Sequence, residues 1–393
     1  MSRFSARVEG DFPFEFRRVI SLTSITFLFL VVCNSFNWPN VKFWGLGAKE
    51  FLDLEVTMNF VDCYEKYGSQ IYSVPNGVDC SNYVYGFLLV AAGDLFGINH
   101  ISTSILGFIF LAILAYVIAY FLSALKVKFV SSLVIMLVLV LSPPVSLLAQ
   151  RANIDIFIAF LTILGFQAIQ HRVNAIGFVL IALTVLIKFY TLPLLFLLLF
   201  QKTFRKPIYF ISTLVILVVA IINFSLIKSL PADGVYAAFG NRSFYYYLQD
   251  AQLLPTNIPN FFRDLSGLVL VITVVVALLV VDSRFKNISG DLTLDKRLDA
   301  PNAFLCIGLS CYMFGMSYDY RLIFFLLPML LFQTEVIFFD GIFKYFFITA
   351  IAFTSFNTNI FVQLVGDILI GLLTSFLLFL FLRSVHGLPV SKE

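Results

Sequence analysis

The segment Ile101–Ala124, ISTSILGFIFLAILAYVIAYFLSA, contains no charged residue and is long enough to cross a bilayer as one helix. Comparable apolar stretches recur along the chain, at Ser21–Phe36, Phe129–Ala149, Ile208–Ile227 and Leu265–Val281. Of the 393 residues, 60% are hydrophobic and 12% are charged, whereas a soluble domain carries about 25% charged residues. We therefore expect an integral membrane protein.

The fold class predicted from this pattern is all-α, a polytopic transmembrane helix bundle of about 10–12 spans. Residues 1–393 are expected to form one membrane-embedded domain. Arg17 and Arg18 precede the first apolar run, as in a signal peptide, but no small-residue cleavage pattern follows. We expect a first transmembrane helix over Val19–Phe36 instead. The formal charge of +3 is too small to indicate nucleic acid as a partner.

The Lys and Arg residues indicate how the chain is oriented. With the N-terminus inside, 17 of the 26 fall in inner loops, as the positive-inside rule predicts. We expect a multi-pass protein of the plasma (inner) membrane, with both termini cytoplasmic and a first outer loop, 37–100, that carries surface helices. The stretch Tyr83–Gly97 contains Asp94 and is short for a span, so it is expected to be one of those helices. Counting it as a span would invert every later loop, against the charge rule.

In this orientation, nearly every charged residue that remains at an outer helix end lies on the same side of the membrane. The set is Asp53, Asp62, Arg151, Asp155, Lys188, Arg242, Asp319 and Arg321. Charged groups at membrane depth are costly and usually functional. We therefore expect one outward-facing polar cavity.

The acids and the Arg151 segment each have a structural alternative. Asp53 and Asp62 are either solvated loop acids or general bases held near apolar groups. Asn153 and Asp155 suit a helix start, as a side-chain cap and as an acid that favours the helix dipole. Arg151 would be unfavourable at a helix N-terminus, so we expect it to pair with Asp155 or to bind an anion.

The remaining cations also have two interpretations. Lys188 interrupts a long apolar stretch, where it either snorkels to the surface or binds a phosphate as a point charge. Pro193 is expected to break the helix there. Arg321 either pairs with Asp319 or offers a fork for phosphate or sugar oxygens.

The cysteines divide into two groups. Cys63 and Cys80 share the first outer loop, where a disulfide is plausible if the compartment is oxidising. Cys33, Cys306 and Cys311 lie in apolar segments and are expected to fill the core. No Cys/His cluster has metal-site spacing.

Several short motifs follow one another in a suggestive order. They are Asp53-Leu54-Glu55-Val56, Tyr83-Val84-Tyr85-Gly86, Arg151-Ala152-Asn153-Ile154-Asp155, Leu186-Ile187-Lys188-Phe189-Tyr190-Thr191-Leu192-Pro193 and Tyr318-Asp319-Tyr320-Arg321-Leu322-Ile323. In order and topology they resemble the GT-C superfamily of membrane glycosyltransferases, above all glycosyltransferase family 87 and its uncharacterised bacterial relatives. The chain departs from the family pattern by Ala152 and by Thr191-Leu192 before Pro193.

The resemblance implies a hexosyltransferase that moves a sugar from a polyprenyl-phosphate donor to a glycan or glycolipid acceptor on the outer face. Asp53, with Asp62 as its rival, would be the catalytic base, and Asp155 the second catalytic acid. The substrate would be bound by Arg151, Asn153, Lys188, Tyr190, Arg242, Asp319 and Arg321. No cofactor is implied with certainty, and a divalent cation held by Asp53 and Asp155 stays open.

Two other functions fit the same pattern. A transporter or flippase of lipid-linked glycans would also use broken helices and charges at membrane depth, although the chain shows no internal repeat. A glycan polymerase that uses lipid-diphosphate repeat units is the other alternative.

Overall fold

The computed structural model is predominantly helical. It describes residues 16–38, 50–68, 70, 80, 87–125, 127–200, 204, 206–226, 238–239, 272, 300–313, 317–331, 365–372 and 374–375. The sequence also predicts a second outer loop at 228–264, a charged inner loop at 282–302 and a final helical hairpin at 346–382. These three segments lie largely outside the described residues, and so do both termini.

Two helices in the described part of the chain are long and apolar enough to cross a membrane. One is α2 (Phe16–Ser35), and the other is the stretch His100–Ala124, which joins the 3-10 turn η2 (His100–Ser102) to α6 (Thr103–Ala124). A third candidate is α7 (Phe129–Leu141) with α8 (Pro143–Arg151), if this pair is one span. The pair is bent by 68°, because Pro143 starts a new helix where a continuous span was expected.

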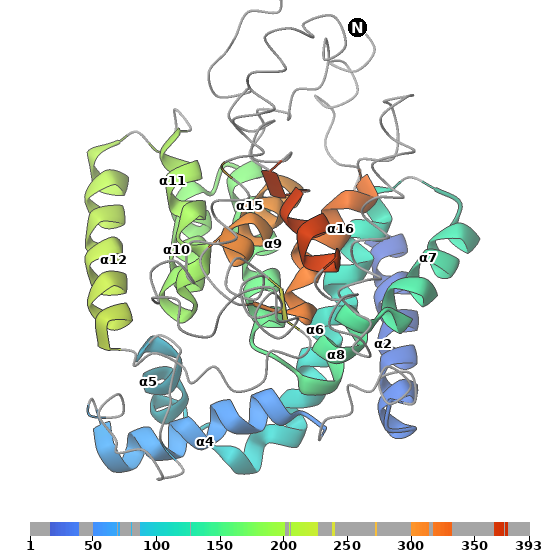
Figure 1. Cartoon of the computed structure of the whole chain (residues 1–393), viewed down its shortest axis with the longest axis horizontal. Coiled ribbons are helices and arrows are strands. Elements are labelled where there is room, and N and C mark those ends of the chain that lie inside the picture. The colour runs from blue at the N-terminus through green and yellow to red at the C-terminus, as the bar shows by residue number, and fades with distance from the viewer. Residues whose placement is uncertain are drawn as a thin grey trace, which may run out of the picture.

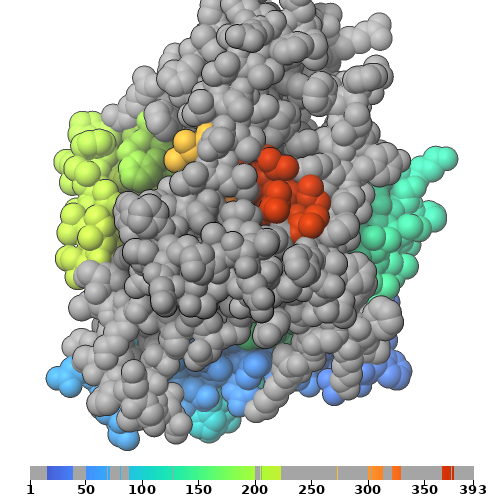
Figure 2. All heavy atoms as spheres, in the orientation of Figure 1, coloured from blue at the N-terminus to red at the C-terminus, as the bar shows by residue number. Residues whose placement is uncertain are grey.

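Further apolar helices follow along the chain. They are α9 (Asp155–Gln170), α10 (Asn174–Ile187), α11 (Pro193–Phe200), α12 (Pro207–Leu226), α15 (Ala300–Met313) and α16 (Ile323–Leu331). Between α10 and α11 lies the 3-10 turn η3 (Phe189–Thr191). Pro193 therefore begins a helix rather than interrupting one, since its missing N–H is not needed there. Figure 2 shows α12 and α7 at opposite edges of the molecule.

Two helices lie in the expected outer loop. The helix α4 (Leu52–Tyr67) runs across one end of the bundle, at a steep angle to α2 and α12 (Figure 1). Asp53 and Asp62 are thus helical residues, not loop acids. The expected helix Tyr83–Gly97 is present as α5 (Phe87–Leu95), whose nine residues are too few for a span.

Aromatic side chains join α6 to the C-terminal helices at the centre of the bundle. The ring of Phe121 lies 4.8 Å from that of Phe304 on α15, which lies 5.3 Å from that of Phe324 on α16. All three side chains are fully buried. This core fixes the start of α16, and with it the 3-10 turn η5 (Asp319–Leu322) that precedes it.

Glycines permit two close approaches between helices. A Cβ on Gly107 of α6 would overlap the ring of Phe51, the residue before α4. A Cβ on Gly177 of α10 would lie 2.7 Å from the carbonyl oxygen of Gly165 on α9. Small side chains therefore let α4 rest on α6 and let α9 and α10 pack closely as antiparallel neighbours.

A short antiparallel pair joins two distant segments. In it β1 (Ala238–Phe239) pairs with β2 (Ser317–Tyr318), in the register Ala238 to Tyr318 and Phe239 to Ser317. The turn η5 follows β2 directly and packs against α8. Arg321 is brought to the end of α8 in this way.

Candidate functional site

Asp155, the first residue of α9, is fully buried and accepts hydrogen bonds on both carboxylate oxygens. Lys188 Nζ donates to Oδ1 over 2.5 Å, and the hydroxyl of Tyr190 donates to the same oxygen over 2.6 Å. Arg321 Nε donates to Oδ2 over 2.9 Å. A buried carboxylate needs such compensation, because burial without partners would disfavour its charge.

The three partners of Asp155 lie in short non-α-helical segments next to helix ends. Lys188 follows the last residue of α10 in an extended conformation, and Tyr190 lies in the turn η3 just beyond it. Arg321 comes from η5. The ring of Tyr190 lies between the two cations, with its centroid 5.8 Å from Lys188 Nζ and 5.0 Å from Arg321 Cζ.

Asn153 connects this group to the second acid, Asp53. Its Oδ1 accepts from the backbone N–H of Asp155 over 2.9 Å and from Lys188 Nζ over 3.3 Å. Its Nδ2 donates to Asp53 Oδ2 over 2.5 Å. The amide is fully buried and engaged on both sides, so Asn153 links the two acids. Its role in substrate binding stays a prediction.

Asp53 lies in the first turn of α4 and its side chain is 10% exposed. Arg151 Nε donates to Asp53 Oδ1 over 2.7 Å, and Arg151 Nη2 contacts the same oxygen. The start of α4 is held against α8, since the backbone N–H of Phe51 donates to the carbonyl of Gln150 over 2.7 Å. Gln150 is fully buried and was not predicted. A polar residue within an apolar run was the signal for it.

We call these seven residues the ion network: Asp53, Arg151, Asn153, Asp155, Lys188, Tyr190 and Arg321. The ion network contains two carboxylates and three basic side chains. Burial lowers the pKa of Lys188 to about 8, although the Asp155 carboxylate raises it, and Arg321 lowers it further. An anion that reached this network would meet an excess of positive charge, which is the usual requirement for phosphate binding.

Comparisons with protein-family models, with curated proteins and with solved structures find no match for the chain. The function must therefore be argued from the ion network and its surroundings.

The structure brings together seven of the ten predicted site residues. Asp62 lies elsewhere on α4, where its Oδ2 is 2.5 Å from Nδ1 of His100. Arg242 lies outside the described residues. Asp319 is placed as the first residue of η5, and its side chain is not among the described ones.

Two structural expectations for the cations were wrong. Arg151 does not begin a helix but ends α8, where a cation suits the dipole. Its guanidinium bonds to Asp53, whereas Asp155 had been expected. Lys188 does not snorkel to the surface, because its side chain is 3% exposed and points to Asp155.

Asn153 stabilises the start of α9 much as predicted. It lies one residue before the N-cap residue, Ile154, and accepts from the first helical N–H through its side chain.

A divalent cation does not suit the ion network. Each carboxylate oxygen of Asp53 and Asp155 already accepts from an amide or a cation, and nearby cations would repel a metal ion. Within the described ranges there is no group of three His, Cys, Asp or Glu side chains that could hold one.

The Cys63–Cys80 disulfide is confirmed, with the two Cα atoms 5.7 Å apart. It borders an open cavity of about 410 Å³ lined by Asn59, Asp62, Cys63, Lys66, Cys80 and His100. The histidine was missed because it is distant in sequence from α4. This cavity lies apart from the ion network, none of whose residues line it.

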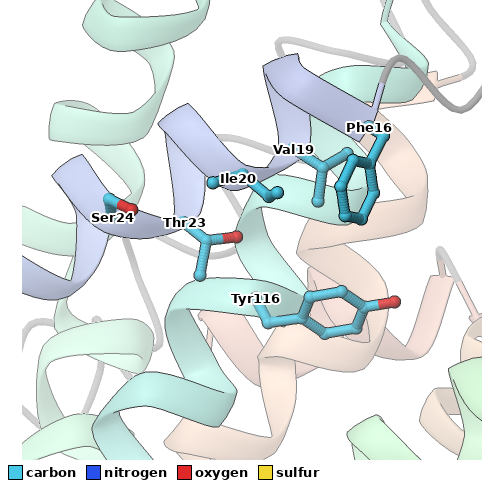
Figure 3. Close-up of a pocket in the computed structure, with 6 residues that line it drawn as sticks. All are labelled: Phe16, Val19, Ile20, Thr23, Ser24 and Tyr116. Atoms are coloured by element: carbon cyan, nitrogen blue, oxygen red, sulfur yellow. The ribbon is translucent and has the colours of Figure 1, made fainter.

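A second, smaller cavity of about 190 Å³ lies between α2 and α6. Figure 3 shows that it is lined by Phe16, Val19, Ile20, Thr23, Ser24 and Tyr116. It too shares no residue with the ion network. Neither of these two cavities is lined by the ion network, so the expected outward-facing polar cavity at these residues stays a prediction.

Proposed function

We propose that this chain is a polytopic membrane protein and a glycosyltransferase of GT-C type, which transfers a sugar from a polyprenyl-phosphate donor to a glycan or glycolipid acceptor. Its ion network would face the outer side of a plasma (inner) membrane, with both termini cytoplasmic. The charge distribution over the predicted loops supports this orientation.

The outward faces of the peripheral helices support membrane embedding. On α12 large apolar side chains are exposed, namely those of Ile208, Phe210, Ile211, Leu214, Val215, Val218 and Ile221. On α2, Phe16, Ile20, Leu28 and Val32 are exposed in the same way. Water would not tolerate such contiguous apolar faces, whereas lipid would.

The observation that carries the proposal is the composition and placement of the ion network. Four segments that are distant in sequence meet there, at residues 53, 151–155, 188–190 and 321, and each brings at least one charged side chain. Asp53 lies nearest the surface of the two acids, beside Arg151 at the network's edge, while Asp155 is fully buried and holds Lys188 and Arg321 in place. This arrangement provides one acid for proton transfer and several cations for a phosphate.

The chemistry would proceed as one displacement. Asp53 takes the proton of an acceptor hydroxyl, whose oxygen attacks the anomeric carbon of the donor sugar from the face opposite the phosphate. The bond from that carbon to the phosphate oxygen breaks, and polyprenyl phosphate leaves with the bond's electron pair. The configuration is inverted. Lys188, Arg151 and Arg321 offset the charge that develops on the leaving phosphate.

The direct test is an in vitro transfer assay with the purified chain and a panel of polyprenyl-phosphate sugars. Formation of a glycosylated acceptor and of free polyprenyl phosphate, in equal amounts, is the expected result. Failure of every donor in the panel to react, with the protein folded, would refute the assignment.

Transport of lipid-linked glycans is the second candidate, and the 68° bend between α7 and α8 is the observation that favours it. A flippase would move an intact fluorescent lipid-linked glycan across a liposome membrane without breaking a glycosidic bond. Translocation without product would select this function over transfer.

A further inference from the structure

The two partners of Asp53 hold it in unequal ways. Asn153 cannot turn away, since its oxygen is fixed by the Asp155 backbone and by Lys188, and the side chain is fully buried. Arg151 has a side chain that is 25% exposed and ends its helix. Arg151 is therefore the more accessible of the two partners, at the network's edge.

Arg151 also occupies the oxygen that the proposed reaction needs. Both of its contacts with Asp53 are to Oδ1, while Asn153 takes Oδ2. A general base must receive a hydroxyl at hydrogen-bond distance. Because two guanidinium nitrogens contact Oδ1, an acceptor hydroxyl cannot bind to that oxygen until Arg151 moves.

A phosphate is a strong competitor for Arg151. The planar guanidinium matches phosphate geometry and can donate two parallel hydrogen bonds to it. Lys188 donates to Asn153 and Arg321 donates to Asp155, so both cations belong to the same network as Arg151 and add to its attraction for an anion.

We propose that Arg151 is a displaceable positioning residue, which holds Asp53 Oδ1 at rest and transfers to the donor's phosphate when the donor binds. Asn153 keeps Asp53 in place through Oδ2, and Oδ1 becomes open to the acceptor hydroxyl. The donor must then bind before the acceptor can be deprotonated. This inference rests on the proposed function, because it specifies how the same site is ordered.

A double-mutant cycle on ligand binding tests the transfer of Arg151 without requiring catalysis. The probe is farnesyl phosphate, a short-chain prenyl monophosphate, and its affinity is measured for the full chain in detergent. The four proteins are the wild type, Asp53→Asn, Arg151→Met and the double variant. Asp62→Asn, which removes an acid from the same helix without touching Arg151, is the matched control.

If Asp53 competes with phosphate for Arg151, Asp53→Asn should tighten probe binding by about tenfold when Arg151 is present. The same change should have no effect in the Arg151→Met background, and Asp62→Asn should leave affinity unchanged. If Arg151→Met does not fold, as judged by thermal unfolding, Arg151→Gln takes its place.

Two results would overturn the inference. Equal tightening in both backgrounds would mean that loss of a negative charge explains the effect without Arg151. No tightening in either background would mean that Asp53 and phosphate do not share this residue. Since no sugar is transferred in this experiment, its failure leaves the transfer assay as an independent test of the proposed function.

Discussion

Asp53 and Asp62 lie on the same helix but in different surroundings. The side chain of Asp53 is 10% exposed and is bound by Arg151 and Asn153 inside the ion network. That of Asp62 is 33% exposed and pairs with His100, beside an open cavity. Asp53, next to cations, is the base of the proposed reaction, whereas Asp62 joins α4 to the turn before α6.

We expect Asp53→Asn to lower glycosyl transfer by about 10²-fold or more, because the amide keeps the shape but cannot take a proton. Initial rates with saturating donor and acceptor measure this. Asp62→Asn should retain near-normal rates, and the opposite result for the two variants would move the base to Asp62.

Lys188 should give the reaction an alkaline limit. Its pKa is lowered to about 8, below the ordinary value for lysine, so it loses its charge as the pH rises through 8. Donor binding should weaken over this range because a neutral amine no longer attracts phosphate. The profile of kcat/KM for the donor should therefore fall above about pH 8.

Lys188→Met should abolish the fall in kcat/KM above about pH 8, and it should raise the donor KM at neutral pH. The control is Lys66→Met, which removes an exposed lysine at the other end of α4. This variant should still show the fall in kcat/KM. If kcat/KM still falls above about pH 8 in Lys188→Met, the fall is caused by the titration of another group.

At the scale of elements, α4 is anchored at both ends. Its start rests on α6 through Phe51 and Gly107 and on α8 through the bond to Gln150. Its end is tied by the Cys63–Cys80 disulfide and by the Asp62–His100 pair. The position of Asp53 therefore depends also on contacts of α4 outside the ion network.

Gly107→Ala should lower transfer by about tenfold or more, since the new Cβ would push the ring of Phe51 and with it the start of α4. Phe51→Leu has a smaller side chain and should restore part of the rate in the double variant. Rates of the single and double variants measure this. No rescue would indicate that α6 itself is disturbed.

Breaking the disulfide should destabilise the fold by about 2–4 kcal/mol, because it frees the chain between α4 and residue 80. Thermal unfolding with and without reductant measures the effect as a lower Tm. The double variant Cys63→Ser/Cys80→Ser should show no further response to reductant. A Tm that reductant does not change in the wild type would contradict the prediction.

At the scale of the whole molecule, the orientation in the membrane is testable with single cysteines. Glu65 on α4 and His171, just after α9, are both exposed. In a background without other cysteines, Glu65→Cys should react with an impermeant reagent from outside and His171→Cys from inside. Labelling of both from the same side would contradict the proposed topology and the outward placement of the ion network.

The sequence by itself determined the helical character and the composition of the site. Long uncharged runs such as Ile101–Ala124 predict membrane-spanning helices, and the stretch His100–Ala124 is a helix long and apolar enough to cross a bilayer. Charged residues at the ends of such runs were identifiable for the same reason, since burial of Lys188 or Asp155 is costly without a purpose. Five of these charged candidates meet in the ion network, together with Asn153 and Tyr190.

Tertiary structure alone decided which of these groups pair. The sequence offered Arg151 as a partner of Asp155, yet α8 ends at Arg151 and turns it to Asp53. Lys188 and Arg321 reach Asp155 because α10 returns beside α9 and η5 packs on α8. Contacts between segments that are far apart in sequence depend on how helices pack, and local pattern carries no information about that packing.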